Sequence, residues 1–265
     1  LEGIAVVGRG TVDGRGEAWW QRFREPGGRA LRYPRPRLIS FVDCDNVLIE
    51  GLTLTRSPSW TINPVRCHNV TIDKVTIANP PDSPNTDGIN PDSCANVHIS
   101  NCHIDVGDDC IAIKGLKGCQ RKACEKIVIE ACELWTDLAN VFRIGYECET
   151  EAMQDLTARD IDVLHYSPRY RKPEEFWCHA VFFLQPSDNM PMRRMRFEDF
   201  RINADGGDIL LVVAKPMICG VSGMKYTSAG RLADCVFKSI FVTGIKGRFR
   251  GEICVVGHDE QHTVE

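Results

Sequence analysis

The feature that most limits how this chain can fold is a repeat of short, alternating apolar segments. Its clearest units open with Asn46-Val47-Leu48-Ile49, Asn69-Val70-Thr71-Ile72, Asn96-Val97-His98-Ile99 and Lys126-Ile127-Val128-Ile129. Weaker copies begin at Asp155, Arg194 and Asp234. The starts at 46, 69, 96, 126 and 155 are 23, 27, 30 and 29 residues apart, and the last two gaps are 39 and 40 residues. Alternation with period two indicates β-strands, and repeats of this length separated by Asn, Asp, Gly and Pro turns favour a parallel β-helix.

The same repeat disfavours other architectures. Leucine-rich repeats carry a denser Leu pattern, a propeller blade needs about four strands per unit, and helical periodicity is absent at any useful length. We therefore predict an all-β, single-stranded right-handed parallel β-helix that forms one domain over residues 1–265. Because Leu1 opens a segment typical of the middle of a β-rich domain, we expect a further segment upstream. The basic, aromatic and Pro-rich residues 17–37 form either a loop that flanks a cleft or a solvated surface loop.

The 13 cysteines recur at fixed places in the repeat. Four of them fall two residues before the residue that opens a unit: Cys44, Cys67, Cys94 and Cys124. Recurrence at one repeat position predicts reduced side chains stacked in the interior, where a free thiol behaves as a small hydrophobe. The nearest approach to a metal-binding pattern is Cys119 and Cys124, without a second pair at matching spacing, so we predict no metal site.

Charge and hydropathy exclude two classes of partner. The net charge of −4 provides no basic patch for nucleic acid. No apolar run approaches the roughly 18 residues that a membrane-spanning helix needs. We therefore expect neither a nucleic acid nor a membrane as partner, and the sequence does not indicate an oligomeric state.

Two short motifs place three carboxylates close together in sequence and, in this fold, in space. Asn85-Thr86-Asp87 and Gly107-Asp108-Asp109 are separated by 21 residues from Asp87 to Asp108. If that distance is one turn of the helix, the two motifs lie on neighbouring turns about 4.8 Å apart. Like charges so close raise the pKa of at least one group, which provides an acid and a base from one residue type. The alternative is that all three aspartates only cap turns between strands.

These motifs and their surroundings resemble glycoside hydrolase family 28, and its bacterial branch in particular. The stretches that carry the resemblance are Arg37-Leu38-Ile39-Ser40-Phe41, Asn46-Val47-Leu48-Ile49-Glu50-Gly51, Ser57-Pro58-Ser59-Trp60-Thr61-Ile62, Asn85-Thr86-Asp87-Gly88-Ile89-Asn90-Pro91-Asp92-Ser93 and Asp108-Asp109-Cys110-Ile111-Ala112-Ile113-Lys114. The family comprises polygalacturonases and related pectin-cleaving enzymes on a pectin-lyase-like solenoid. The resemblance implies that Asp108 is the general acid and that Asp87 and Asp109 activate the attacking water, with inversion. It also implies a polysaccharide or oligosaccharide substrate and no cofactor.

The chain departs from the family pattern at two places. Ala139-Asn140-Val141 stands where the family has Gly-His-Gly, and Phe182-Phe183-Leu184 stands where it has Arg-Ile-Lys, which grips the uronate carboxylate. A second register would put Arg143-Ile144 in that role at the cost of deleting one turn. We prefer the first register and expect a pectic or related substrate other than polygalacturonate. Two alternatives stay open: a β-helix polysaccharide lyase with a Ca²⁺ site and a basic residue, and a catalytically impaired carbohydrate-binding protein.

The candidate substrate-binding residues are Asn85, Lys114, Asn140 and Arg143. Asn85 could orient a carboxylate or join an asparagine ladder, Asn140 could equally belong to such a ladder, and Arg143 could form a surface salt bridge. Among the aromatic residues, Trp60, Trp135 and Trp177 could stack on sugar rings, although packing is the commoner role of large aromatics. We expect structural or surface roles for His103, His165 and His179 because no carboxylate or Cys lies at ligand spacing from them in the sequence.

Overall fold

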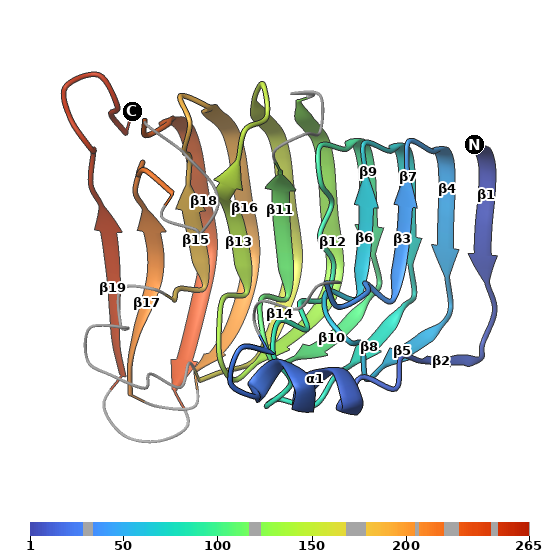
Figure 1. The fold of residues 1–265 in the computed structure, drawn as a ribbon. Helices are drawn as coiled ribbons and strands as arrows, with labels where there is room; N and C mark the ends of the chain where they lie inside the picture. The colour runs from blue at the N-terminus through green and yellow to red at the C-terminus, as the bar shows by residue number, and fades with distance from the viewer. Residues whose placement is uncertain are drawn as a thin grey trace.

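The computed structural model winds the chain into a right-handed parallel β-helix whose coils stack from the N-terminal to the C-terminal end (Figure 1). The structure describes residues 1–28, 34–116, 123–167, 179–204, 207–219, 228–244 and 249–264. Every strand pairing between named strands is parallel, and together they form three ladders along the stack. Among the described residues, none of the helices has the length and apolar character that crossing a membrane requires.

The first ladder contains β1 (Glu2–Val7), β4 (Asp45–Glu50), β7 (His68–Asp73), β9 (Ala95–Ser100), β12 (Cys124–Thr136), β14 (Met153–Tyr166), β16 (Pro191–Ala204) and β18 (Arg231–Gly244). The second contains β2 (Thr11–Asp13), β5 (Thr53–Thr55), β8 (Thr76–Ala78) and β10 (His103–Val106), and continues into the C-terminal halves of the four long strands. The third contains β3 (Ile39–Val42), β6 (Ile62–Val65), β11 (Ile111–Gly115), β13 (Phe142–Cys148), β15 (Phe182–Gln185), β17 (Gly207–Ala214) and β19 (Phe249–Val255). Isolated bridges through Ile89 and Asp92 connect β6 to β11.

The register of the first ladder confirms the predicted repeat. The first apolar residue of each unit pairs with that of the next: Val47, Val70, Val97, Ile127, Leu156, Met195 and Cys235. The residue that opens each unit adopts a left-handed backbone conformation, with φ of 56° at Asn46, 55° at Asn69 and 57° at Asn96. Asn tolerates this conformation better than most residues. Its amide also bonds the next coil, because Asn69 Nδ2 donates to Asn46 Oδ1 at 3.0 Å and Asn96 donates to Asn69.

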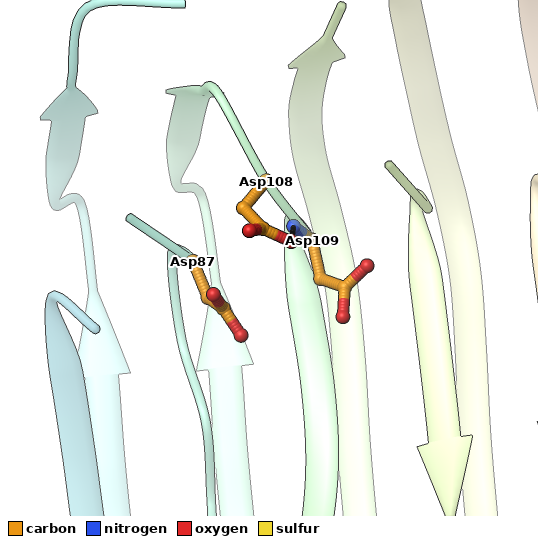
Figure 2. Close-up of side chains that lie close together, drawn as sticks. All are labelled: Asp87, Asp108 and Asp109. Carbon is orange, nitrogen blue, oxygen red and sulfur yellow. Dashed lines mark hydrogen bonds between the residues drawn. The ribbon is translucent and has the colours of Figure 1, made fainter. Parts of the chain in front are cut away.

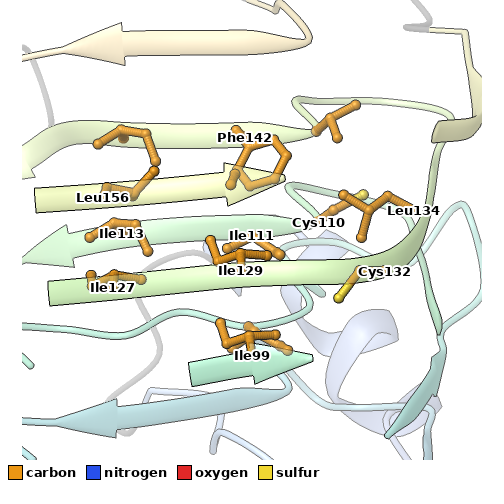
Figure 3. Packing of buried hydrophobic residues seen from close by; sticks show 14 of the residues in the cluster. Ile99, Cys110, Ile111, Ile113, Ile127, Ile129, Cys132, Leu134, Phe142 and Leu156 are labelled. Carbon is orange, nitrogen blue, oxygen red and sulfur yellow. The ribbon is translucent and has the colours of Figure 1, made fainter. Parts of the chain in front are cut away.

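Aliphatic side chains stacked coil on coil fill the interior (Figure 3). Ile49, Ile72, Ile99 and Ile129 are in register and fully buried. Burying each such side chain stabilises the fold by about 1.5–3 kcal/mol. The structure also confirms that Cys44, Cys67, Cys94 and Cys124 are free and buried. Cys119 lies outside the described residues.

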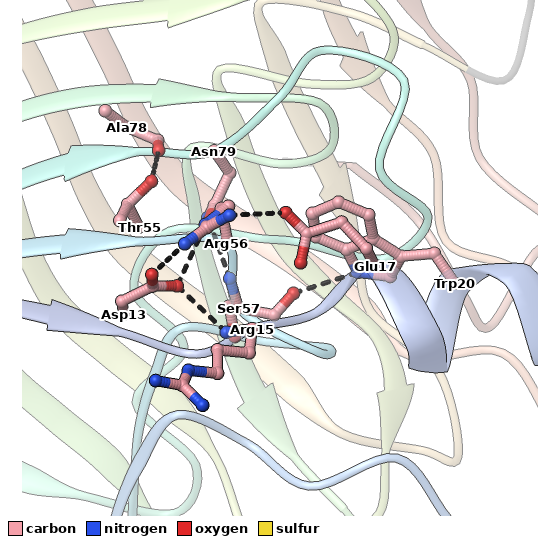
Figure 4. A network of polar contacts seen from close by, with 9 residues as sticks. All are labelled: Asp13, Arg15, Glu17, Trp20, Thr55, Arg56, Ser57, Ala78 and Asn79. Atoms are coloured by element: carbon pink, nitrogen blue, oxygen red, sulfur yellow. Dashed lines mark hydrogen bonds and ion pairs between the residues drawn. The ribbon is translucent and has the colours of Figure 1, made fainter.

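One helix, α1 (Glu17–Arg24), replaces part of the loop predicted for residues 17–37. Tertiary contacts hold it: Trp20 is buried and its Nε1 donates to the Ser57 carbonyl at 3.0 Å, while Glu17 pairs with Arg56 at 2.9 Å (Figure 4). The prediction of a loop was wrong there because two helical turns are too short to show periodicity in the sequence. The remainder of the segment that the structure describes runs beside the cleft described below.

Candidate active site

The three aspartates lie on adjacent coils, where the chain turns from the second ladder into the third. Asp108 and Asp109 fall between β10 and β11, and Asp87 lies one coil earlier. The backbone of Asp87-Gly88 runs directly against Asp109-Cys110, with Gly88 N donating to the Asp109 carbonyl at 2.9 Å. A Cβ at Gly88 would lie only 2.4 Å from the Cys110 carbonyl oxygen, so this close approach requires glycine. The carboxylates therefore share one wall, with one oxygen of each within 4.8 Å of the others (Figure 2).

Burial and mutual repulsion both act on this cluster. Asp87 and Asp109 are only 3% and 7% exposed, whereas Asp108 is partly exposed. Burial, followed by the charge of Asp109, raises the pKa of Asp108 to about 7. Burial, followed by the charges of Asp108 and Asp109, raises the pKa of Asp87 well above its usual range. The repulsion between like charges, considered from the sequence, predicts a raised pKa within this cluster. The largest cause, burial, could not be seen in the sequence.

Asn140 holds Asp109 in place. Asp109 Oδ1 accepts hydrogen bonds from Asn140 N at 3.1 Å and from Asn140 Nδ2 at 2.6 Å. Asn140 Oδ1 in turn accepts from Ala180 N at 2.8 Å, which ties the arrangement to the next coil. Within the described part of the chain, Asp109 Oδ2 accepts no hydrogen bond, so this oxygen is available to a water molecule. The ladder alternative for Asn140 is thus replaced by direct contact with a carboxylate.

Two cations occupy the other side of the site. Lys114 is 4% exposed, and its Nζ donates to Glu147 Oε2 at 3.0 Å. Burial lowers the pKa of Lys114, but Glu147, Asp109 and Asp87 more than offset this, so that its pKa is raised. The guanidinium carbon of Arg143 lies 4.4 Å from the centre of the Phe183 ring and 4.5 Å from that of Tyr146.

The third ladder places Ala112, Arg143 and Phe183 on three successive coils, because Ala112 pairs with Arg143 and Arg143 pairs with Phe183. Phe182 and Leu184, which the preferred register aligns with the two cations of the family motif, are buried in the core. The side chain beside Arg143 on the next coil is Phe183.

One pocket of about 210 Å³ collects all seven predicted site residues. We call it the catalytic pocket, and its predicted members are Asp87, Asp108, Asp109, Asn85, Lys114, Asn140 and Arg143. Within the described residues, the Asn85 side chain makes no hydrogen bond to a carboxylate or to another Asn. Its Oδ1 instead accepts from Arg35 Nη2 at 2.6 Å. The three aspartate oxygens are also close enough to one another to ligate one cation.

Five further residues line the catalytic pocket: Trp60, Ala139, Tyr146, Glu147 and His179. His179 was predicted to be structural or on the surface, and the fold places it in the pocket lining, next in the chain to Ala180, whose N–H bonds Asn140. Nothing in its local sequence marks it. Glu147 could have been suspected as the buried counterion that Lys114 needs. Trp135 packs as the alternative predicted, stacking on His165 at 4.4 Å, and Trp177 lies outside the described residues.

Comparison with known proteins supports this description. The model of the family "Glycosyl hydrolases family 28" matches residues 1–133, half of the chain. A "Probable polygalacturonase" of Vitis vinifera is 41% identical over 169 residues, which cover 61% of this chain and 33% of that protein. A "Polygalacturonase" of Cryptomeria japonica is 37% identical over 116 residues, 43% of this chain and 23% of that protein. The chain thus matches a third or less of the length of these curated relatives.

Two solved structures share the fold. An exopolygalacturonase from Thermotoga maritima superposes with a TM-score of 0.75 at 22% identity, covering 92% of this chain and 59% of that chain. An endo-xylogalacturonan hydrolase from Aspergillus tubingensis gives 0.56 at 15% identity, covering 91% and 69%. Identities this low show a common β-helix and nothing more. The sequence match over half its length shows that the chain belongs to glycosyl hydrolase family 28.

Proposed function

We propose that this protein hydrolyses a glycosidic bond in a pectic or related plant polysaccharide, with Asp108 as the general acid. The observation that carries the proposal is the environment of Asp108. It is partly exposed in the catalytic pocket, and burial beside Asp109 raises its pKa to about 7. A carboxyl group that keeps its proton near neutral pH can protonate the oxygen of the leaving sugar.

In this proposal, water is activated by the two buried carboxylates. Asp109 is held by Asn140 through Oδ1, so Oδ2 is placed to accept a proton from water. Asp87 lies on the adjacent coil, where its Oδ2 accepts a hydrogen bond from Asn90 Nδ2 at 2.7 Å. Such fixed carboxylates orient a water for attack as the bond to the leaving sugar breaks.

We propose inversion of configuration at the cleaved carbon, although the carboxylates are unusually close. Inverting enzymes usually separate them by about 6.5–9.5 Å, and retaining enzymes by about 5–5.5 Å. Here one oxygen of each lies within 4.8 Å of the others. Proton NMR of the first product anomer formed decides between the two outcomes. Inversion supports water activation by the cluster, whereas retention would mean that one aspartate attacks the sugar directly.

The lining of the catalytic pocket also supports a substrate other than polygalacturonate. Its described ionisable residues include four acids, Asp87, Asp108, Asp109 and Glu147, against the two cations Lys114 and Arg143. Lys114 already pairs with Glu147, and the residue beside Arg143 on the next coil is Phe183 and adds no charge. A sugar without charge suits this pocket better than a uronate.

The test is release of reducing ends across a panel of pectic and plant-wall glycans, for the parent protein and Asp108→Asn. We expect turnover on substrates that contain neutral sugars and its loss in the variant. The highest kcat/KM on polygalacturonate would contradict the substrate proposal. An unsaturated, ultraviolet-absorbing product that disappears on chelation would indicate a lyase that uses the aspartates as cation ligands. Sugar binding without turnover would indicate a binding protein.

A further inference from the structure

A second pocket, which we call the outer pocket, adjoins the catalytic pocket. Its volume is about 350 Å³, within the roughly 300–1,000 Å³ typical of small-molecule sites. Trp60 and Asn85 line both pockets and therefore form their common wall. The rest of the outer pocket's lining includes Phe23 at the end of α1, Arg35 and Arg37. The segment after α1 thus extends the cleft beyond the three aspartates.

The two pockets carry opposite charge. The described lining of the outer pocket contains two arginines and no acidic side chain, a formal charge of +2. The described lining of the catalytic pocket has four acids and two lysine or arginine side chains, a formal charge of −1 when Asp108 holds the proton that the proposed mechanism needs and His179 is counted as neutral. A ligand that spans both pockets would therefore meet a sharp change of sign at Trp60 and Asn85.

Arg37 is held in position while its hydrogen-bonding groups remain available. Its guanidinium carbon lies 4.7 Å from the centre of the Trp60 ring. Lys114 Nζ, in the catalytic pocket, lies 5.5 Å from the same ring. Within the part of the chain that the structure describes, Arg37 makes no hydrogen bond or ion pair, and its side chain is exposed. A guanidinium fixed over an indole with free donors is suited to bind a carboxylate through two hydrogen bonds.

Arg35, unlike Arg37, uses its donors in hydrogen bonds within the protein. Its Nη1 donates to the Pro58 carbonyl at 3.0 Å and to the Pro84 carbonyl, and its Nη2 donates to Asn85 Oδ1 at 2.6 Å. Its guanidinium carbon lies 3.9 Å from the centre of the Phe23 ring. Arg35 therefore joins α1 to the common wall and acts as a positioning residue, while its charge adds to the potential of the pocket.

We propose that the outer pocket is a second sugar-binding subsite that takes a carboxylate-bearing sugar of the substrate chain and binds its carboxylate through Arg37. This inference rests on the proposed function and makes it more specific. The substrate it describes is a mixed chain, in which an acidic sugar in the outer pocket neighbours an uncharged sugar in the catalytic pocket. Arg35 and Arg37, in the outer pocket, would also supply positive charge that the absent Arg-Ile-Lys motif does not.

The test is calorimetric titration of the Asp108→Asn protein, which should bind substrate without consuming it, with tetragalacturonate and with its full methyl ester. The ester has the same rings without the charges. Arg37→Met keeps a long side chain beside Trp60 but removes the charge and the donors, and Arg37→Lys keeps the charge but loses the planar pair of donors that grips a carboxylate. Arg9→Met is the matched control, because Arg9 is exposed and lines neither pocket. Thermal unfolding of each variant verifies that it folds.

We expect Arg37→Met to weaken tetragalacturonate binding by roughly tenfold, Arg37→Lys by about threefold, and Arg9→Met not at all. Binding of the methyl ester should not change, and the Arg37 effect should shrink at high salt. Equal affinity of the Arg37→Met and Arg9→Met proteins for tetragalacturonate, or equal losses for acid and ester, would overturn the subsite alone. Failure of the Asp108→Asn protein to bind either ligand would overturn the subsite, whereas the proposed function is tested separately by release of reducing ends from the glycan panel.

Discussion

At the scale of single residues, the site depends on how burial and hydrogen bonding differentiate three identical side chains. All three line the catalytic pocket, but Asp108 is partly exposed, whereas Asp87 and Asp109 are buried. The spacing of the two motifs predicted that these residues lie close together, but it could not show how deeply each is buried. Burial is the larger cause of the raised pKa at both Asp87 and Asp108, and it is a property of the whole coil stack.

Asn140 is expected to matter through Asp109. Asn140→Ala removes the 2.6 Å bond from Nδ2 and leaves a buried carboxylate with one donor fewer. We expect kcat to fall by on the order of 10–100-fold and the free energy of unfolding to fall by about 1–3 kcal/mol. Steady-state kinetics and urea unfolding measure the two effects. Unchanged kcat in the folded variant would show that the orientation of Asp109 is unimportant.

The pH dependence of activity follows from Asp108. A general acid must be protonated, and the pKa of this group is about 7 in the folded protein. We therefore expect kcat/KM to fall as the pH rises through about 7. The apparent value belongs to the coupled cluster, because the three carboxyl groups titrate together. A rate that increases steadily from pH 6 to pH 9 would contradict this assignment.

The same shift predicts a change in stability. In the unfolded chain an Asp ionises near pH 3.9, whereas folding raises the pKa of Asp108 to about 7. As the pH rises, the unfolded state loses its proton first, so stability falls from about pH 4 and the penalty is complete above about pH 7. Asp108→Asn removes the ionisable group and with it this stability penalty. We expect this variant to be more stable by about 1–2 kcal/mol at pH 8, less than the full shift implies because the group is coupled and partly exposed. At pH 4, urea unfolding should give no difference.

At the scale of elements, the sequence predicted the strands better than the helix and loops that connect them. The openings of the repeat could be located because a left-handed position recurs in every coil, at Asn46, Asn69, Asn96 and their successors. Helix α1 could not be predicted, since its stability comes from Trp20 and Glu17 contacting residues about 40 positions away. The role of Phe23 and Arg37 in a pocket depends on the same packing.

The left-handed positions can be tested by a matched pair of substitutions. Asn69→Ala loses the amide hydrogen bonds to Asp45 and Asn46 and puts a less tolerant residue at φ 55°. We expect a loss of about 1–3 kcal/mol in the free energy of unfolding. Asn69→Gly loses the same hydrogen bonds but relieves the backbone, so it should be less destabilised than Asn69→Ala. The opposite order in urea unfolding would rule out backbone conformation as the constraint.

At the scale of the whole molecule, a continuous stack of coils makes the site. Asp87, Asp109 and Asn140 come from three successive coils, and Arg143 is ladder-paired with Ala112 and Phe183 on the coils before and after it. The spacing of the motifs therefore predicted this wall once the fold had been predicted. A cleft-flanking role was one of two alternatives predicted for residues 17–37, but the outer pocket itself and the place of His179 could not be predicted, because turns of irregular length bring them to the cleft.

The central claim is that Asp108 donates a proton to the leaving sugar, and leaving-group dependence tests it most directly. The measurement is kcat of the parent and of Asp108→Asn on the natural glycan and on a glycoside with a very acidic leaving group. We predict that the variant loses on the order of 10²–10⁴-fold on the glycan and much less on the activated glycoside, which needs little protonation. If folded Asp108→Asn is as active as the parent on the glycan, or loses equally on both substrates, Asp108 is not the general acid.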